Sequence, residues 1–177
     1  MNKKICVIGA GHWGINHINS LNKLGSLYGV IDIDPKLISK VSNLYPDVKC
    51  FRDVDTALRE NFDGFTIATP ADTHYKIAKK IIMARKHVLI EKPMTLSVLE
   101  SEELVFLADK FEINLMVGHV LLFHPAIIKI KDMIDKGVIG DVQYIYSNRL
   151  NLGKIRTEKN VFWSFAPHDI AIFQFLI

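Results

Sequence analysis

The sequence has few cysteines, no long apolar run and no excess of charge of one sign. Only two of its 177 residues are cysteine, and both lie outside any Cys-x-x-Cys pair, so a disulfide framework or a zinc knuckle has no support. The 22 basic and 19 acidic residues are interspersed, which argues against a nucleic-acid-binding surface. No apolar run approaches about 18 residues, and the amino terminus lacks a signal-peptide core. We therefore expect a cytoplasmic protein that does not enter a membrane.

The composition is that of an ordinary globular protein, with 49% hydrophobic and 23% charged residues. Short apolar segments alternate with helix-like segments from the first residues onward. The expected strands are residues 4–8, 28–33, 48–51, 64–68, 87–90 and 113–117. The expected helices are residues 12–24, a segment opening at 35, 53–59, 72–84 and 97–111, and Asp53 is expected to cap the third of them. This alternation predicts the α/β class, with a Rossmann doubly wound parallel sheet covered by helices on both faces.

The pattern changes near residue 119, so we expect a dinucleotide-binding domain over residues 1–118 and the incomplete start of an α+β catalytic domain over residues 119–177. The expected elements of this second part are a helix from Pro125 to Lys136, a strand over 141–150 and an apolar helix over 170–177. Because nothing follows that last segment to cover its apolar face, we expect the chain to be part of a longer protein.

The first motif with chemical meaning is Gly-x-Gly-x-x-Gly, directly after the first expected strand. Gly9 permits a tight turn, Gly11 lets the backbone approach a pyrophosphate, and Gly14 lets the helix pack on the sheet. The helix amino terminus offers N–H groups and a positive dipole end to phosphates. With His12 and Trp13 inside it, the motif predicts a dinucleotide site. The alternative is a tight glycine turn without a ligand.

Asp32 favours NAD over NADP as the cofactor. It lies at the end of the second strand, 23 residues after Gly9, where a carboxylate can accept both adenosine ribose hydroxyls and repels a 2′-phosphate. The next residue is Ile33, which we also expect beside the cofactor, and no basic residue follows immediately. Asp34 is the competing carboxylate, but it precedes Pro35 and is expected to cap the next helix.

Two further motifs stand at the carboxyl ends of the fourth and fifth strands, the edge where open α/β sheets bind ligands. The residues expected near the cofactor there are Thr69, Pro70, His74, Glu91, Lys92 and Pro93. A lysine beside a nicotinamide can hydrogen-bond a substrate hydroxyl and favour its alkoxide. The alternative for Glu91 and Lys92 is an exposed ion pair, and Asp72 is expected to cap the following helix.

The order Gly-x-Gly-x-x-Gly, Thr-Pro-x-x-x-His, Glu-Lys-Pro and a later His-Asp pair resembles the glucose-fructose oxidoreductase, inositol dehydrogenase and MocA family along essentially the whole chain. The resemblance implies that a C-terminal domain with a large open sheet follows the Rossmann domain, and that the protein forms homo-oligomers. It also implies that Lys92 is the active-site lysine, with Glu91 near the nicotinamide ribose. His168 is then the catalytic histidine, and the Lys92–Pro93 bond is cis.

One position departs from the family pattern. Many members carry an aspartate four residues before that histidine, where this chain has Ser164, which cannot stabilise an imidazolium as a carboxylate does. Residues 151–156 and 163–169 resemble instead a branch that oxidises the 3-hydroxyl of UDP-linked N-acetylhexosamines or their uronates. The candidate substrate residues, for which plain surface positions are the alternative, are Arg149, Asn151, Arg156 and Asp169.

The sequence therefore predicts an NAD-dependent oxidoreductase that acts on a ring hydroxyl of a sugar nucleotide, with His168 taking the proton and Lys92 steadying the oxygen. The alternatives are a non-catalytic NAD-binding protein and a catalytically dead, shortened family member. From spacing alone, His168 is more typical of a helix-start residue bonded to the backbone than of a catalytic histidine. A metal site is not expected, because histidine pairs such as His12 and His17 are five residues apart rather than three or four.

Overall fold

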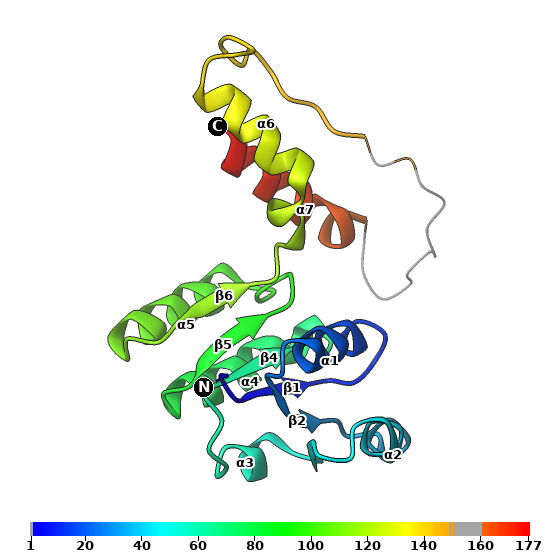
Figure 1. The fold of residues 1–177 in the computed structure, drawn as a ribbon. Coiled ribbons are helices and arrows are strands. Elements are labelled where there is room, and N and C mark those ends of the chain that lie inside the picture. The colour runs from blue at the N-terminus through cyan, green and yellow to red at the C-terminus, as the bar shows by residue number, and fades with distance from the viewer. Residues whose placement is uncertain (1, 149, 151–160) are drawn as a thin grey trace. The chain divides into compact units, whose positions relative to one another are not determined.

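The computed structural model describes residues 2–148, 150 and 161–177. The chain forms two compact units, Met1–Gly118 and His119–Ile177, and each is described by itself (Figure 1).

The first unit contains a six-stranded sheet in the order β3-β2-β1-β4-β5-β6, with every neighbouring pair parallel. The strands are β1 Ile5–Ile8, β2 Leu27–Ile31, β3 Lys49–Phe51, β4 Gly64–Ile67, β5 His87–Ile90 and β6 Leu115–Val117. The chain runs outward from β1 through β3, then crosses to β4 and runs the other way. This reversal between β1 and β4 is the topological switch point where open α/β sheets bind ligands. The predicted fold class is confirmed.

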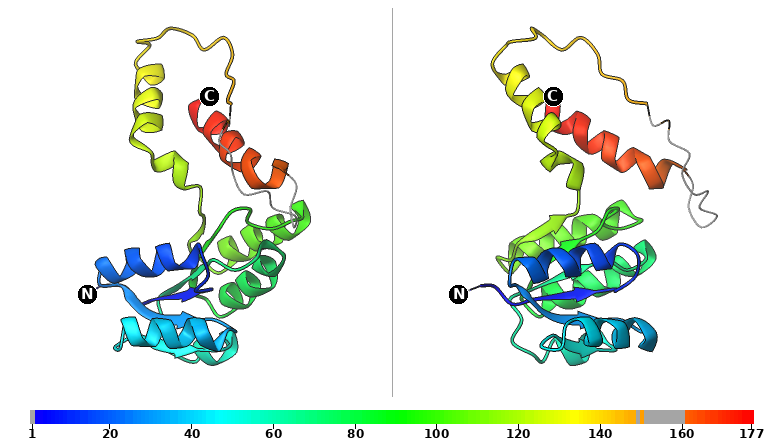
Figure 2. Two further views of the ribbon diagram at one scale, coloured as in Figure 1. Left: turned by 90° about the vertical axis from the view of Figure 1, so that its right-hand side faces the viewer. Right: turned by 45° about the vertical axis from the view of Figure 1, so that its right-hand side comes forward.

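Helices pack on both faces of this sheet (Figures 1 and 2). They are α1 Gly14–Lys23, α2 Pro35–Leu44, α3 Val54–Ala57, α4 Ala71–Met83 and α5 Val98–Lys110. Successive strand residues point to opposite faces, so Val7 packs with the α1 and α2 side chains while Cys6 and Ile8 pack with those of α4 and α5. Because both faces are covered, the strands are apolar throughout.

Short-range capping contacts start two of these helices as the sequence predicts. The Asp34 carboxylate accepts a hydrogen bond from the Lys36 N–H at 2.8 Å, with Pro35 opening α2. Asp53 accepts from the Thr56 N–H at 2.7 Å at the start of α3. The prediction that Asp72 caps α4 is wrong, because Pro70 holds the cap position and Asp72 already lies in the first helical turn.

The regular secondary structure in the described part of the second unit is helical. It contains the 3-10 helix η1 Val120–Phe123, α6 Pro125–Asp135 and α7 Val161–Leu176. The strand predicted over 141–150 is wrong for the residues that are described there. A strand needs a neighbouring strand to satisfy its N–H and C=O groups. No described residue of this unit belongs to a strand, so no such neighbour is present there. Tyr144 and Tyr146 stack on one another instead, with ring centroids 6.3 Å apart.

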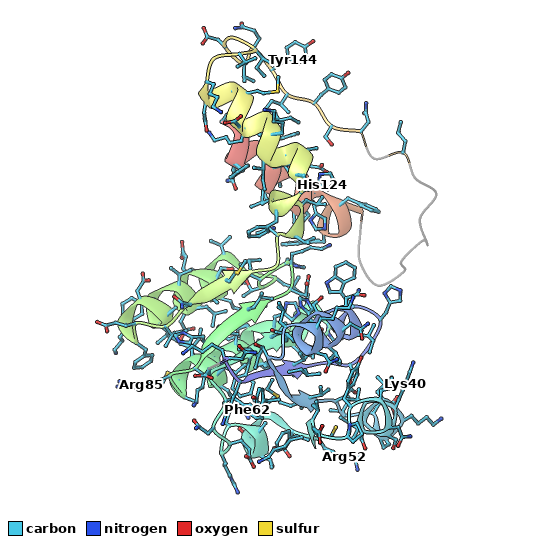
Figure 3. All side chains as sticks on the ribbon, in the orientation of Figure 1. Lys40, Arg52, Phe62, Arg85, His124 and Tyr144 are labelled. Atoms are coloured by element: carbon cyan, nitrogen blue, oxygen red, sulfur yellow. The ribbon has the colours of Figure 1, made fainter. Side chains whose placement is uncertain are left out.

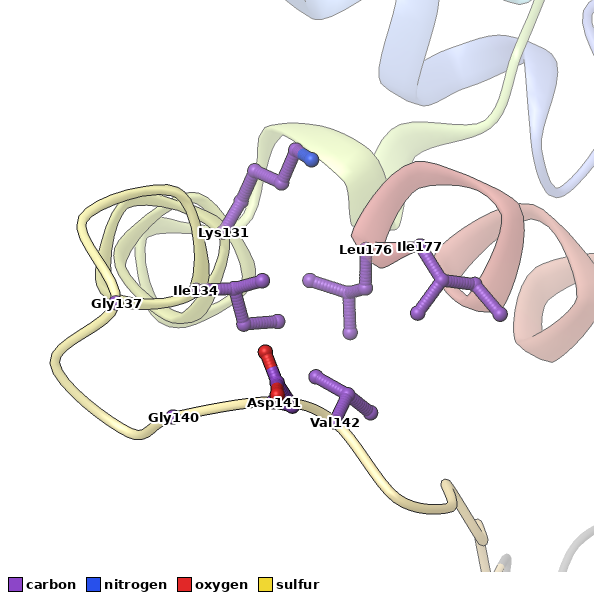
Figure 4. A pocket seen from close by; sticks show the side chains of 8 residues that line it. All are labelled: Lys131, Ile134, Gly137, Gly140, Asp141, Val142, Leu176 and Ile177. Atoms are coloured by element: carbon purple, nitrogen blue, oxygen red, sulfur yellow. The ribbon is translucent and has the colours of Figure 1, made fainter.

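The apolar segment predicted over 170–177 is the end of the longer helix α7. It packs against α6, and a shallow hollow opens between α6, residues 140–142 and the end of α7 (Figure 4). Ile134, Val142 and Leu176 present apolar side chains to this hollow. Ile170 in α7 and Ile177 after it stay exposed.

Candidate dinucleotide and active site

The glycine loop between β1 and α1 combines two packing glycines with one that faces open space. Gly9 has φ +93°, and a Cβ there would lie 2.8 Å from the Ala68 carbonyl oxygen at the end of β4. A Cβ at Gly14 would lie 1.9 Å from the Gly9 carbonyl oxygen. By contrast, no atom lies within 4 Å of a Cβ built on Gly11. The open space beside Gly11, in front of the α1 amino terminus, fits a pyrophosphate.

The Asp32 carboxylate is anchored next to this loop. Its Oδ2 accepts from the Ala10 N–H at 2.7 Å, and its Oδ1 accepts from the Asp34 N–H at 2.8 Å. Since a carboxylate has about four acceptor positions, two remain for a pair of ribose hydroxyls. Ile33, the next residue, is 83% exposed and offers an apolar surface beside that position.

The structure brings Arg52, which the sequence analysis missed, to the same place. It follows β3, where Figure 3 labels it. Its Nη2 donates to the Ile33 carbonyl oxygen at 3.5 Å. The sequence does not show that Arg52 neighbours Ile33, because the two residues come together only when β3 pairs with β2 in the folded sheet. A guanidinium therefore lies beside the residue that follows Asp32.

His74 connects the loops that follow β4 and β5. It is 1% exposed, with Nδ1 at 2.9 Å from the Pro93 carbonyl oxygen and Nε2 at 2.8 Å from the Thr69 carbonyl oxygen. With both ring nitrogens engaged by main chain, its contribution is to hold the Thr69–Pro70 and Lys92–Pro93 segments together. The Lys92–Pro93 bond is cis, as the resemblance implies.

Glu91, at the end of β5, is buried rather than part of an exposed ion pair. Only 8% of the residue is exposed, and its Oε1 lies 2.7 Å from the His17 Nε2. The Lys92 N–H donates to its Oε2 at 3.3 Å. Burial raises the pKa of this carboxyl, but hydrogen bonds from His17 and Trp13 and the charge of His17 outweigh it, so the pKa falls below its usual value. Glu91 therefore stands as a carboxylate at the carboxyl edge of the sheet, after β5.

The remaining predicted site residues belong to the second unit. His168 lies inside α7, after the internal Pro167, so the interpretation of His168 as a helix-start residue is wrong. The Asp169 Oδ1 accepts from the Ser147 hydroxyl at 2.9 Å. Arg149, Asn151 and Arg156 lie outside the described residues.

Among the residues that the structure describes, no group of three or more metal-binding side chains is present. None of the described helices combines the length and the apolar character that a membrane span requires.

The sequence profile of the oxidoreductase family with an NAD-binding Rossmann fold, the glucose-fructose oxidoreductase, inositol dehydrogenase and MocA group, matches residues 3–119. The chain therefore belongs to this family. The resemblance seen in the sequence motifs is confirmed, and so is NAD as the family's cofactor.

Within this family, the chain is similar to a characterised sugar-nucleotide dehydrogenase. The chain is 32% identical over 167 residues to UDP-N-acetylglucosamine 3-dehydrogenase of Acidithiobacillus ferrooxidans, covering 93% of this chain and 51% of that protein. The solved structure of that enzyme, GnnA, matches with a TM-score of 0.70 over 75% of this chain and 42% of its own, at 32% identity.

A putative oxidoreductase from Klebsiella pneumoniae matches with a TM-score of 0.81 at 26% identity, over 99% of this chain and 51% of its own. The chain thus spans about half or less of the length of the relatives it matches.

Proposed function

We propose that this protein oxidises a ring hydroxyl, at C3, of a sugar nucleotide such as UDP-N-acetylglucosamine or its uronate, by hydride transfer to NAD. The observation that carries the proposal is the 32% identity to UDP-N-acetylglucosamine 3-dehydrogenase along almost the whole chain. The geometry of the first unit supports it, because the glycine loop, Asp32 and the Glu91–Lys92 segment all stand at the carboxyl edge of one parallel sheet.

The residues of the first unit bind and orient the cofactor. The open space at Gly11 receives the pyrophosphate, and the two remaining acceptor positions of Asp32 take the adenosine ribose hydroxyls. NAD is preferred because a 2′-phosphate would meet the Asp32 carboxylate. Bound NAD supplies a hydride acceptor at C4 of its nicotinamide. Glu91 lies near the nicotinamide ribose and orients the nicotinamide end of the cofactor.

The acid–base work falls to Lys92 and His168. The Lys92 ammonium donates a hydrogen bond to the substrate oxygen and stabilises the alkoxide character that develops as hydride leaves. His168 takes the hydroxyl proton, and Asp169 orients that segment of the site. Residues 119–177 in this proposal form the start of the catalytic domain, and the protein self-associates as its family resemblance implies.

The proposal is tested by incubating the protein with NAD and UDP-N-acetylglucosamine and following NADH fluorescence. Substrate carrying deuterium at C3 should slow reduction and leave deuterium in the reduced cofactor, while deuterium at C4 should do neither. UDP-glucose serves as the control for the N-acetyl group. If NAD binds but no sugar nucleotide reduces it, the protein is the non-catalytic NAD-binding alternative.

A further inference from the structure

Trp13, the N-cap residue of α1, and His17, inside α1, both contact Glu91, the residue that follows β5. Trp13 and His17 are four positions apart, so they lie one above the other on the same side of the helix. His17 Nε2 lies 2.7 Å from Glu91 Oε1, with the two side chains only 23% and 11% exposed. The Trp13 side chain hydrogen-bonds the same carboxyl. The helix that follows the glycine loop therefore also contacts Glu91, the residue predicted to lie near the nicotinamide ribose.

The Glu91 carboxylate has little freedom to move away from this helix. The Lys92 N–H donates to its second oxygen, and a Cβ on Gly118, after β6, would lie 3.0 Å from Oε1. A carboxylate only accepts hydrogen bonds, so the His17 Nε2 carries the proton in this contact. His17 therefore selects one position of the Glu91 side chain from among those the surrounding backbone allows.

We propose that His17 is a positioning residue for the nicotinamide half of the cofactor, acting through Glu91. The inference rests on the proposed function, in which Glu91 lies near the nicotinamide ribose. Its physical basis is the stiffness of α1. The amino terminus of this helix faces the pyrophosphate site, and His17 holds Glu91 from one turn further along, so the helix sets the spacing between the two contacts.

The test compares NAD with ADP, which carries the adenosine and the diphosphate but lacks the nicotinamide riboside. Calorimetric titration of the His17→Ala variant should show NAD affinity reduced about tenfold, the size expected for one lost hydrogen bond to a charged group. ADP affinity should stay at the wild-type value. His17→Gln, whose amide can donate to Glu91, should recover most of the NAD affinity. Asn16→Ala, an exposed change on the same helix, should alter neither ligand's affinity.

A double-mutant cycle separates positioning from support of the helix. If His17 acts through Glu91, then His17→Ala combined with Glu91→Gln should bind NAD as weakly as Glu91→Gln alone. Additive losses, equal losses for NAD and ADP, or an unchanged Glu91→Gln variant would each overturn the inference. Should His17→Ala fold poorly, His17→Gln and Glu91→Gln still give the comparison. A wild-type protein that binds no NAD would instead overturn the proposed function.

Discussion

At the level of single residues, the Glu91 carboxyl shows how burial and hydrogen bonding compete. Desolvation alone would favour the neutral acid, and the hydrogen bonds from His17 and Trp13 reverse that preference, so the pKa is lowered. The native state therefore holds this proton more weakly than the unfolded chain does. The resulting stabilisation is complete above the usual glutamate value of 4.5 and is lost as the pH falls through the lower native pKa.

We therefore predict that the stability advantage of the wild type over Glu91→Gln is constant near neutral pH and shrinks in acid, below 4.5. Urea unfolding curves of both proteins across that range measure the difference. Glu102→Gln, an exposed change on α5, is the matched control and should follow the wild type. An advantage that grows in acid would mean that burial, not hydrogen bonding, dominates at Glu91.

The proposed acid–base roles give a second prediction. If Lys92 and His168 act on the oxygen and proton of the reacting hydroxyl as proposed, Lys92→Ala and His168→Ala should each reduce turnover about a hundredfold or more. NAD affinity should change little in either variant. Stopped-flow reduction of NAD measures the rates, with Lys76→Ala on the exposed side of α4 as control. Near-native turnover in either variant would remove that residue from the mechanism.

In the proposed site, cofactor preference would depend on Asp32 and on the Arg52 guanidinium near the Ile33 carbonyl. In Asp32→Ser the repulsion toward a 2′-phosphate is removed while the cation remains, so we predict NADP affinity to rise about tenfold or more. Parallel titrations with NAD and NADP measure the change. Adding Arg52→Ala to Asp32→Ser should abolish the gain, and a gain that survives would show that the arginine does not reach the phosphate.

Among the elements, the loop that joins β1 to α1 contains one glycine required for packing, Gly14, and another, Gly11, that packing alone does not require. Gly14 has no room for a methyl group because the Gly9 carbonyl stands 1.9 Å from the position of a Cβ. Gly11 has room within the protein itself. The two glycines therefore serve different needs although they belong to one motif.

We predict that Gly14→Ala lowers the free energy of unfolding by about 1–3 kcal/mol, as overpacking does, and weakens NAD binding because α1 must shift. Gly11→Ala should leave stability nearly unchanged and still weaken NAD binding, since its methyl group enters the pyrophosphate space. Urea unfolding and calorimetry on both variants give the comparison. Unimpaired NAD binding by Gly11→Ala would contradict the placement of the pyrophosphate.

Across the whole molecule, the two units differ in how well they are buried. The first has two apolar clusters, one on each face of its sheet. In the described part of the second unit only Leu176 is buried, while Ile128, Ile170 and Ile177 are at least half exposed. Fewer buried contacts mean a lower free energy of local opening.

We predict that hydrogen exchange on a monomeric sample protects the amides of β1 and β4 for much longer than those of α6 and α7. Mass spectrometry of peptic fragments measures both regions in one experiment. Added NAD should slow exchange in the first unit further, since it binds only the folded state. Uniform protection through Leu176 would contradict the inference that the second unit opens at a lower free energy than the first.

Features that depend on near neighbours in the chain could be predicted from the sequence. The α/β alternation placed all six strands to within a few residues, and Asp34 and Asp53 were recognised as caps because a cap bonds a backbone N–H two or three positions away. The Gly-x-Gly-x-x-Gly spacing likewise identified the loop between β1 and α1. These patterns are local, so composition and spacing carry them.

Contacts between residues far apart in the chain depend on the tertiary structure. His17 and Glu91 are 74 positions apart and meet only because β1 and β5 lie in one sheet with α1 packed against it. Arg52 reaches Ile33 only through the β2–β3 pairing. Residues 141–150 alternate as a strand does, yet the described ones form none, because a strand exists only where another strand satisfies its backbone. The local sequence pattern determines which secondary structures a segment can form, and its tertiary contacts determine which of them it does form.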